Sequence, residues 1–230
     1  MFQKHIALSL GLAMATVSAV AAPGWDLAPD YLTNTNPNGA WSYGKVTASP
    51  TNAFSTLVWN PATNSYGIAQ VGDTFIYKNV SGSSDYGIGN GKVSLESDWG
   101  NAAVRWTAPA AGTYSFTVAV GGSTVSQLNG YGNNFADMAG VKVNGVDEAA
   151  ASYVDTGTSK LKQWSFSVAL APGGTVDTFV LNPGFANGGN TQTDISVSAV
   201  PEPASALLLG LGIGALALRR HRKAASAASA

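Results

Sequence analysis

The stretch that decides the fold reads Tyr114-Ser115-Phe116-Thr117-Val118-Ala119-Val120. Large apolar residues alternate along it with small or polar ones. Because successive side chains of a strand point to opposite faces of a sheet, this pattern predicts a half-buried β-strand. Just before it, Pro109-Ala110-Ala111-Gly112 supplies the residue types of a turn.

Segments of the same kind recur on both sides of this strand. Further strands are predicted at residues 41–46, 53–59, 73–78, 103–107, 141–143, 164–170, 175–181 and 194–199. Turns separate them, among them Asn144-Gly145, where both residues tolerate positive φ, and Pro172-Gly173-Gly174. Residues 22–38 have no periodicity and are expected to form a loose entry segment.

No part of the body shows a sustained helical period. Roughly nine to eleven short strands joined by Gly, Pro and Asn turns predict an all-β fold, a β-sandwich of jelly-roll type, because such folds leave few exposed sheet edges. The order of the strands stays open. Residues 103–114, 141–145 and 174–177 resemble jelly-roll domains of bacterial surface proteins and carbohydrate-binding modules, and residues 36–44 are similar to the opening of the same group.

The N-terminus has the parts of a secretory signal peptide. Lys4 is followed by an apolar stretch and by small residues up to Ala21, so cleavage is expected between Ala21 and Ala22. Residues 1–21 then form the signal peptide, and residues 22–199 form one β-sandwich domain, which is long enough to bury a substantial core.

The C-terminus has three parts. Val200-Pro201-Glu202-Pro203 favours extended, accessible backbone, because prolines remove amide donors and disfavour helix at the preceding residue. Residues 204–218 form an uncharged apolar run that, as a helix, would be roughly 22 Å long and would only marginally span a hydrocarbon core of about 30 Å. Residues 219–223 carry four Lys or Arg, which tend to stay cytoplasmic. We therefore expect a short transmembrane helix with the body on the far side of the membrane.

This C-terminus, residues 200–223, resembles the PEP-CTERM sorting signal of Gram-negative bacteria. Pro201, Glu202 and Pro203 match its namesake motif, and Arg219-Arg220 match its basic stop. The resemblance implies export by the Sec machinery, an inner-membrane intermediate, cleavage near Pro-Glu-Pro by a membrane exosortase, and delivery to the cell surface. An ordinary single-pass tail anchor is the alternative. Residues 224–230 form a low-complexity tail to which no role is assigned.

Charge and composition exclude several functions. Between Pro23 and Pro201 there are seven Lys or Arg and twelve Asp or Glu, a net charge of −5, whereas the whole chain carries −1. Nucleic acid is a poor partner for such a body. There is no Cys, and the two histidines, His5 and His221, lie in segments expected to be removed. Ser-His-Asp, Cys-His and His-metal catalysis are therefore excluded for the mature body.

A carboxylate pair is the remaining basis for an enzyme, as in polysaccharide cleavage. Glu96 and Asp98 would point to one side of an extended segment, and Asp147 and Glu148 follow the Asn-Gly turn. Neither pair lies in a recognisable motif, and solvated acidic loop residues are the simpler interpretation. We expect no enzyme, with a carboxylate-dependent polysaccharide-degrading enzyme as an alternative.

Calcium is the cofactor that loop carboxylates could hold, and the candidate ligands are Asp73, Asp137 and Asp194. The chain has no Asp-x-Asp-x-Asp-Gly loop, so distant loops would have to assemble the site. No other cofactor is expected.

Sugar binding needs exposed aromatic faces beside polar groups. The candidates are Trp99, Tyr131, Asn133, Asn134, Phe135 and Asp137. Further loop aromatics are Trp59, Tyr66 and Tyr86, whereas Trp41, Trp106 and Trp164 fall on strands and are expected in the core. In the alternative interpretation, Tyr131 and Phe135 pack under neighbouring strands.

These observations predict an exported, non-enzymatic surface or extracellular-matrix protein, associated with exopolysaccharide or biofilm. A glycan-binding module is the alternative function.

Overall fold

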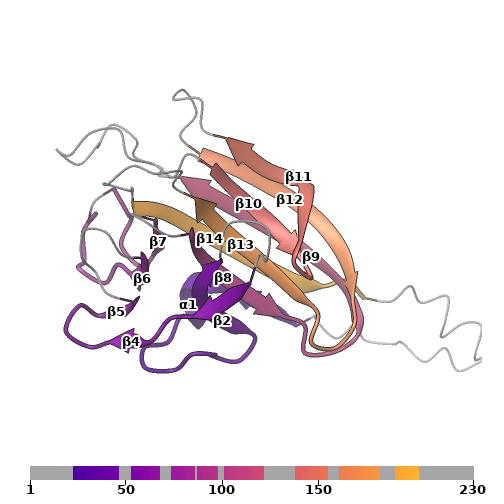
Figure 1. The fold of residues 1–230 in the computed structure, drawn as a ribbon, viewed down its shortest axis with the longest axis horizontal. Coiled ribbons are helices and arrows are strands. Elements are labelled where there is room, and N and C mark those ends of the chain that lie inside the picture. Colours follow the sequence, from indigo (N-terminus) through magenta and orange to yellow (C-terminus); the bar gives the residue numbers. More distant parts are fainter. Residues whose placement is uncertain are drawn as a thin grey trace, which may run out of the picture.

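The structure is a computed structural model, and it describes residues 23–46, 53–67, 74–85, 87–97, 101–121, 138–154, 161–181 and 190–201. Two antiparallel sheets face each other in these residues, as Figure 1 shows. The fold predicted from the sequence, an all-β sandwich, is confirmed.

The larger sheet contains β1 (Gly24–Asp26), β4 (Trp59–Asn60), β5 (Ser65–Gly67), β6 (Thr74–Lys78), β7 (Val93–Ser97), β9 (Gly112–Gly121), β12 (Leu161–Leu170) and β14 (Asn190–Ala199). Its strands lie in the order β12-β9-β14-β7-β6-β5-β4. β1 pairs with the last part of β14, beyond the stretch of β14 that pairs with β7.

The smaller sheet contains β2 (Trp41–Val46), β3 (Phe54–Thr56), β8 (Asn101–Thr107), β10 (Met138–Val143), β11 (Val146–Val154) and β13 (Thr175–Leu181). Its order is β11-β10-β13-β8-β2-β3. A short helix, α1 (Leu27–Asp30), follows β1.

From β7 onward the chain passes repeatedly between the two sheets. β7, β9, β12 and β14 belong to the larger sheet, and β8, β10, β11 and β13 to the smaller one. Apart from the β10–β11 hairpin, consecutive strands from β7 onward therefore lie in different sheets instead of pairing, as in jelly-roll architecture.

β9 has the alternation that its sequence predicts. Tyr114, Phe116 and Val118 are buried, while Ser115 and Thr117 between them are half-exposed. β9 lies between β12 and β14, so its buried side chains have a neighbouring strand on each side.

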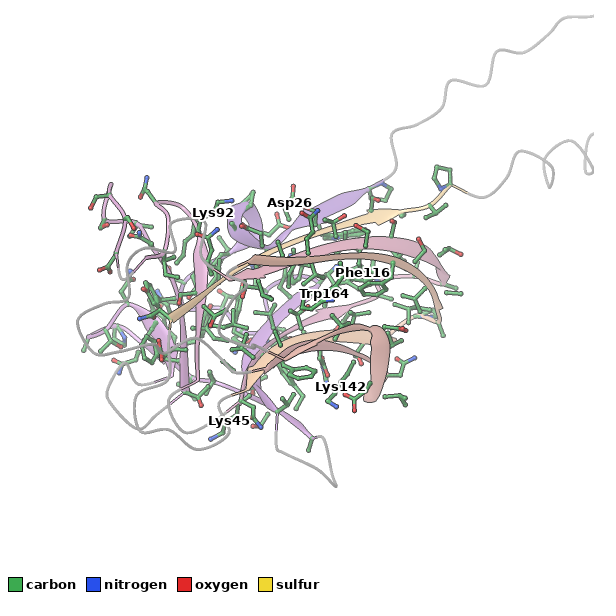
Figure 2. The ribbon with its side chains drawn as sticks, turned by 90° about the horizontal axis from the view of Figure 1, so that it is seen from above. Asp26, Lys45, Lys92, Phe116, Lys142 and Trp164 are labelled. Carbon is green, nitrogen blue, oxygen red and sulfur yellow. The ribbon has the colours of Figure 1, made fainter. Side chains whose placement is uncertain are left out.

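Aromatic rings fill the core between the sheets. Trp41 and Trp106 are each 1% exposed, which confirms their predicted place in the core. The Trp106 ring packs edge to face against Trp25 and Phe116, with ring centroids 5.3 and 5.4 Å away. Figure 2 shows Phe116 and Trp164 between the two layers, and Trp164 is half-buried against the core.

The entry segment is more ordered than its sequence predicts. Residues 24–26 pair with β14, and Leu27 in α1 is fully buried. β7 was also absent from the predicted strands. The predicted Asn-Gly turn is confirmed, with Asn144 at φ 50° and Gly145 at φ 81°.

Among the described residues, no helix is long and apolar enough to cross a membrane. The predicted transmembrane run, residues 204–218, and the predicted signal peptide, residues 1–21, lie outside the described part of the chain.

Candidate functional site

The C-terminal segment leaves the body directly from a central strand. β14 pairs with β9 up to Ala199, and the N–H of Ala199 also donates to the carbonyl oxygen of Pro23 (3.1 Å). One residue further, the N–H of Val200 donates to the carbonyl oxygen of Thr113 (2.8 Å). Pro201 follows at once, so no linker separates the sheet from the Pro-Glu-Pro sequence.

Three turns surround this exit and are bonded to one another. The N–H of Gly173 donates to the carbonyl oxygen of Ala108, and the N–H of Ala108 donates to that of Gly174, both at 2.8 Å. The N–H of Asn144 donates to the carbonyl oxygen of Thr175, also at 2.8 Å. We call residues 108–111, 144–145, 171–174 and 199–201 together the exit end.

The exit end contains no charged residue. The nearest charged side chains on the strands that lead into it are paired with each other. Arg105 forms two hydrogen bonds to Asp177 (2.6 and 2.8 Å), and Lys142 forms an ion pair with Asp147. The end is therefore neutral even though the body as a whole is acidic.

An open depression lies beside the departing chain, with a volume of about 620 Å³. It is lined by Gly112, Thr113, Ala169, Leu170, Ala171, Val200 and Pro201. The first residues of the C-terminal segment thus form one wall of an uncharged surface.

Of the predicted sorting residues, the structure describes Pro201, which is exposed. Glu202, Pro203, Arg219 and Arg220 lie outside the described residues. So do the two residues of the predicted signal cleavage site, Ala21 and Ala22.

The predicted sugar-binding residues also lie outside the described part of the chain, namely Trp99, Tyr131, Asn133, Asn134, Phe135 and Asp137. The described residues that flank them are Ser97 and Asn101 on one side, and Gly121 and Met138 on the other. These flanks lie at the end of the sandwich opposite the exit end, because β9 and β10 both have their other termini at the exit end.

Of the predicted calcium ligands, the structure describes Asp194, whereas Asp73 and Asp137 lie outside. One carboxylate oxygen of Asp194 pairs with Lys92 (2.9 Å), and the other accepts a hydrogen bond from Gln192 (3.1 Å). Within the described ranges, no three His, Cys, Asp or Glu come together as metal ligands. The calcium site stays a prediction.

The candidate catalytic carboxylates occupy different surroundings. Glu96 is 2% exposed on β7, so the expectation of a solvated loop residue is wrong for it. Its proposed partner Asp98 lies outside the described residues. Asp147 is mostly exposed and pairs with Lys142, opposite it in the β10 and β11 register.

Tyr66, predicted as a loop aromatic, is fully buried, because it belongs to β5 and stacks on Tyr43 at 4.6 Å. Trp59 packs edge-on against it, and Tyr31 completes the cluster. Burial raises the pKa of all three tyrosines above the ordinary value. Neighbouring tyrosines add to the rise in pKa at Tyr31, and Tyr66 adds to the rise at Tyr43.

Sequence reasoning missed a row of alternating charges across the smaller sheet. Asp147, Lys142, Asp177 and Arg105 stand opposite one another on β11, β10, β13 and β8. Asp177, fully buried at the centre, lies between two cations. Each residue is isolated in the sequence, and only the strand order, which the sequence left open, could have revealed the row.

Hydroxyl groups gather on the outer face of β12, β9 and β14. Ser167, Ser115 and Ser198 form one cross-strand row, and Ser165, Thr117 and Ser196 form the next. We call these six residues the hydroxyl face. Their side chains are exposed or half-exposed, and the hydroxyls of Thr117 and Ser165 lie 3.4 Å apart.

Several solved structures are distantly similar to the chain. A family 35 carbohydrate binding module from Clostridium thermocellum shares 15% identity over 54% of this chain and 98% of that one, with a TM-score of 0.31. The CBM36-1 domain of a multidomain xylanase from the hindgut metagenome of Trinervitermes trinervoides shares 13% identity over 70% of this chain and 99% of that one, with a TM-score of 0.33.

An exo-beta-1,3-galactanase from Phanerochaete chrysosporium shares 17% identity over 68% of this chain and 32% of that one, with a TM-score of 0.31. Likenesses this distant say nothing of what this chain binds or catalyses. No curated protein matches the sequence.

One family model matches the chain, over residues 199–223, and its description is the PEP-CTERM protein-sorting motif. The match begins at the last residue of β14 and runs through Pro201, Glu202 and Pro203 to the basic cluster. The chain is therefore a β-sandwich that carries a PEP-CTERM sorting motif from the end of β14, the last strand of its described part.

Proposed function

We propose that this chain is a non-enzymatic β-sandwich module that an exosortase-type protease releases from the membrane and that then associates with the exopolysaccharide of the cell surface. The PEP-CTERM motif implies export, membrane-associated processing and surface display. The observation that carries the proposal is the position of this motif, which starts where β14 ends.

This position suits processing without unfolding. Among the residues that the structure describes, Val200 is the last that donates a backbone hydrogen bond to the sheet, and Pro201 is exposed. Cleavage next to Glu202 or Pro203 would therefore break no strand pairing described here. The released product would keep its whole sandwich.

The test is the intact mass of the protein from membrane, surface and medium fractions of a host with an exosortase and of the same host without it. We expect a product that starts at Ala22 and ends near Pro203 only where the exosortase is present. Glu202→Ala in the motif should abolish this product, whereas the matched control Asp85→Ala, in a surface loop, should leave it unchanged. Equal processing in both hosts would contradict the proposal.

A second candidate function, glycan binding, is favoured by the hydroxyl face. Each hydroxyl both donates and accepts hydrogen bonds, as sugar hydroxyls do. Its two rows are about 7 Å apart along the strands and its columns about 4.8 Å apart across them, so they offer a regular polar surface. The predicted aromatic residues Trp99 and Tyr131 are the alternative binding surface.

Retention on exopolysaccharide from the producing host separates these possibilities. Ser165→Glu with Ser196→Glu should abolish retention if the hydroxyl face binds, and Trp99→Ala with Tyr131→Ala should do so if the aromatic loops bind. Ser84→Glu, in the β6 to β7 loop, is the control for added charge. Retention unchanged in both double variants would contradict glycan binding at either surface.

A further inference from the structure

The exit end lies close to the membrane before processing. Only Glu202 and Pro203 separate Pro201 from the apolar run that begins at residue 204. Three residue steps of extended chain span about 10 Å, and the headgroup layer on each side of the hydrocarbon is about 5 to 8 Å thick. When the run is in the membrane, Pro201 therefore lies within about 10 Å of the hydrocarbon, inside the headgroup layer or a few ångströms above it.

The chain between them allows little freedom of orientation. The hydrogen bond from Val200 to Thr113 fixes the departing chain to the sheet (2.8 Å). By residue type, Pro201 and Pro203 disfavour helix at the preceding residues and so favour an extended path beyond the sheet. We therefore expect a short, stiff connection between the sandwich and the apolar run.

The composition of the exit end fits such a surface. Its turn residues Pro109, Ala110, Ala171 and Pro172 are exposed and uncharged, and the neighbouring Val146 is 70% exposed. Bringing them to the headgroups desolvates no charge. The acidic remainder of the body, by contrast, is repelled by a bilayer that contains anionic lipid.

We propose that in the unprocessed chain the exit end rests against the lipid headgroup layer, with the turns at residues 108–111 and 171–174 facing the lipid, and so holds the Pro-Glu-Pro sequence at a fixed height above the hydrocarbon. The inference rests on the sorting function proposed above and adds a membrane-facing surface on the folded domain. The occupant is lipid, and the exosortase itself is the competing occupant that the test must exclude.

The test uses the full chain in vesicles of phosphatidylcholine and phosphatidylglycerol that contain no other protein. Because the chain has no cysteine, single variants Ala110→Cys and Ala171→Cys can each carry one fluorophore. Ser84→Cys is the matched control. Ser84 is exposed in the β6 to β7 loop, and Gly89 of this loop donates a hydrogen bond to the Gln192 side chain on β14. Gln192 precedes Pro201 by nine residues, which is about 30 Å along the strand.

A nitroxide attached to the lipid headgroup should quench most of the fluorescence at residues 110 and 171 and little at residue 84. Ala110→Asp should reduce the quenching at residue 171, and more so in anionic than in neutral vesicles, whereas Ser84→Asp should leave it unchanged. Thermal unfolding of each variant checks that the sandwich is intact.

Equal quenching at all three positions, or quenching at residues 110 and 171 that requires added exosortase, would overturn the inference. Flotation of the chain with the vesicles distinguishes this failure from that of the proposed function. A chain that floats and is cleaved in cells but shows no selective quenching keeps the sorting function and loses this orientation. A chain that does not float contradicts both.

Discussion

At the scale of single residues, the most consequential interaction is the ion pair between Arg105 and Asp177. The Asp177 side chain is fully buried and accepts two hydrogen bonds from Arg105, whose side chain is 26% exposed. Lys142 stands opposite Asp177 on the other side. The buried carboxylate and the Arg105 guanidinium therefore depend on each other for charge compensation.

We expect Asp177→Asn to lower the free energy of unfolding by about 2 to 4 kcal/mol, because it leaves Arg105 without its charge partner in a largely buried place. Lys92→Ala is the matched control. It removes the ion pair with Asp194, in which the Lys92 side chain is 44% exposed and the Asp194 side chain 33% exposed. The free energy of unfolding should fall by less than about 1 kcal/mol. Urea denaturation measures both, and equal losses would contradict the assignment.

Glycine packing gives a second test at this scale. A Cβ on Gly44 in β2 would lie 2.4 Å from both the Phe54 ring and the carbonyl oxygen of Ser55. Gly44→Ala should therefore destabilise the protein by about 1 to 3 kcal/mol, as overpacking does. Gly24→Ala in β1 meets nothing closer than 3.6 Å and should change stability by less than about 0.5 kcal/mol. Similar melting temperatures for the two variants would be inconsistent with this geometry.

At the scale of elements, β14 connects the fold to the sorting motif. It pairs with β9, β7 and β1, so its C-terminal half is central to the larger sheet. A chain of residues 22–203 should unfold at the same temperature as one of residues 22–201. A chain of residues 22–195 lacks the pairings of Ser196, Val197 and Ser198 and should lose most of its cooperative transition. Calorimetry compares the three, and full stability of the shortest would show that β14 is dispensable at this end.

The elements also show what the sequence could predict. β9 was predictable because its apolar and polar residues alternate strictly, and β13 because the Pro172-Gly173-Gly174 turn precedes it. The Asn144-Gly145 turn was predictable because its residue types tolerate positive φ. β1 has only three residues, too few for a period. β7 follows a Gly-rich loop, and its polar residues Ser94 and Glu96 are buried. The sequence suggests that these two residues lie on an exposed face, and the structure shows that they do not.

The candidate site, too, was predictable from the sequence only in part. The Pro201-Glu202-Pro203 motif is a linear pattern, and the sequence alone identified it. The exit end is assembled from four segments that lie far apart along the chain, and its neutrality depends on pairings such as Lys142 with Asp147. Only the sheet order brings these segments together, and no local pattern encodes that order.

At the scale of the whole molecule, the tyrosine cluster makes stability depend on pH in the alkaline range. Burial raises the pKa of Tyr31, Tyr43 and Tyr66 above the ordinary value, which is about 10 in the unfolded chain. Below pH 10 the three are neutral in both states, and their contribution is fully present. Above pH 10 the unfolded chain loses these protons while the folded cluster keeps them, so ionisation favours unfolding.

Stability should therefore fall above pH 10, by at most about 1.4 kcal/mol per pH unit for each tyrosine that stays neutral in the folded state. Tyr43→Phe keeps the ring that stacks on Tyr66 but removes one ionisable group. The decline between pH 10 and 11.5 should consequently be shallower in this variant than in the parent. Urea unfolding at fixed pH values measures the slope, and tyrosinate absorbance recorded in parallel shows whether the ionisation accompanies unfolding. Identical slopes in the two proteins, or tyrosinate absorbance from the whole cluster in the folded state, would contradict a buried and neutral cluster.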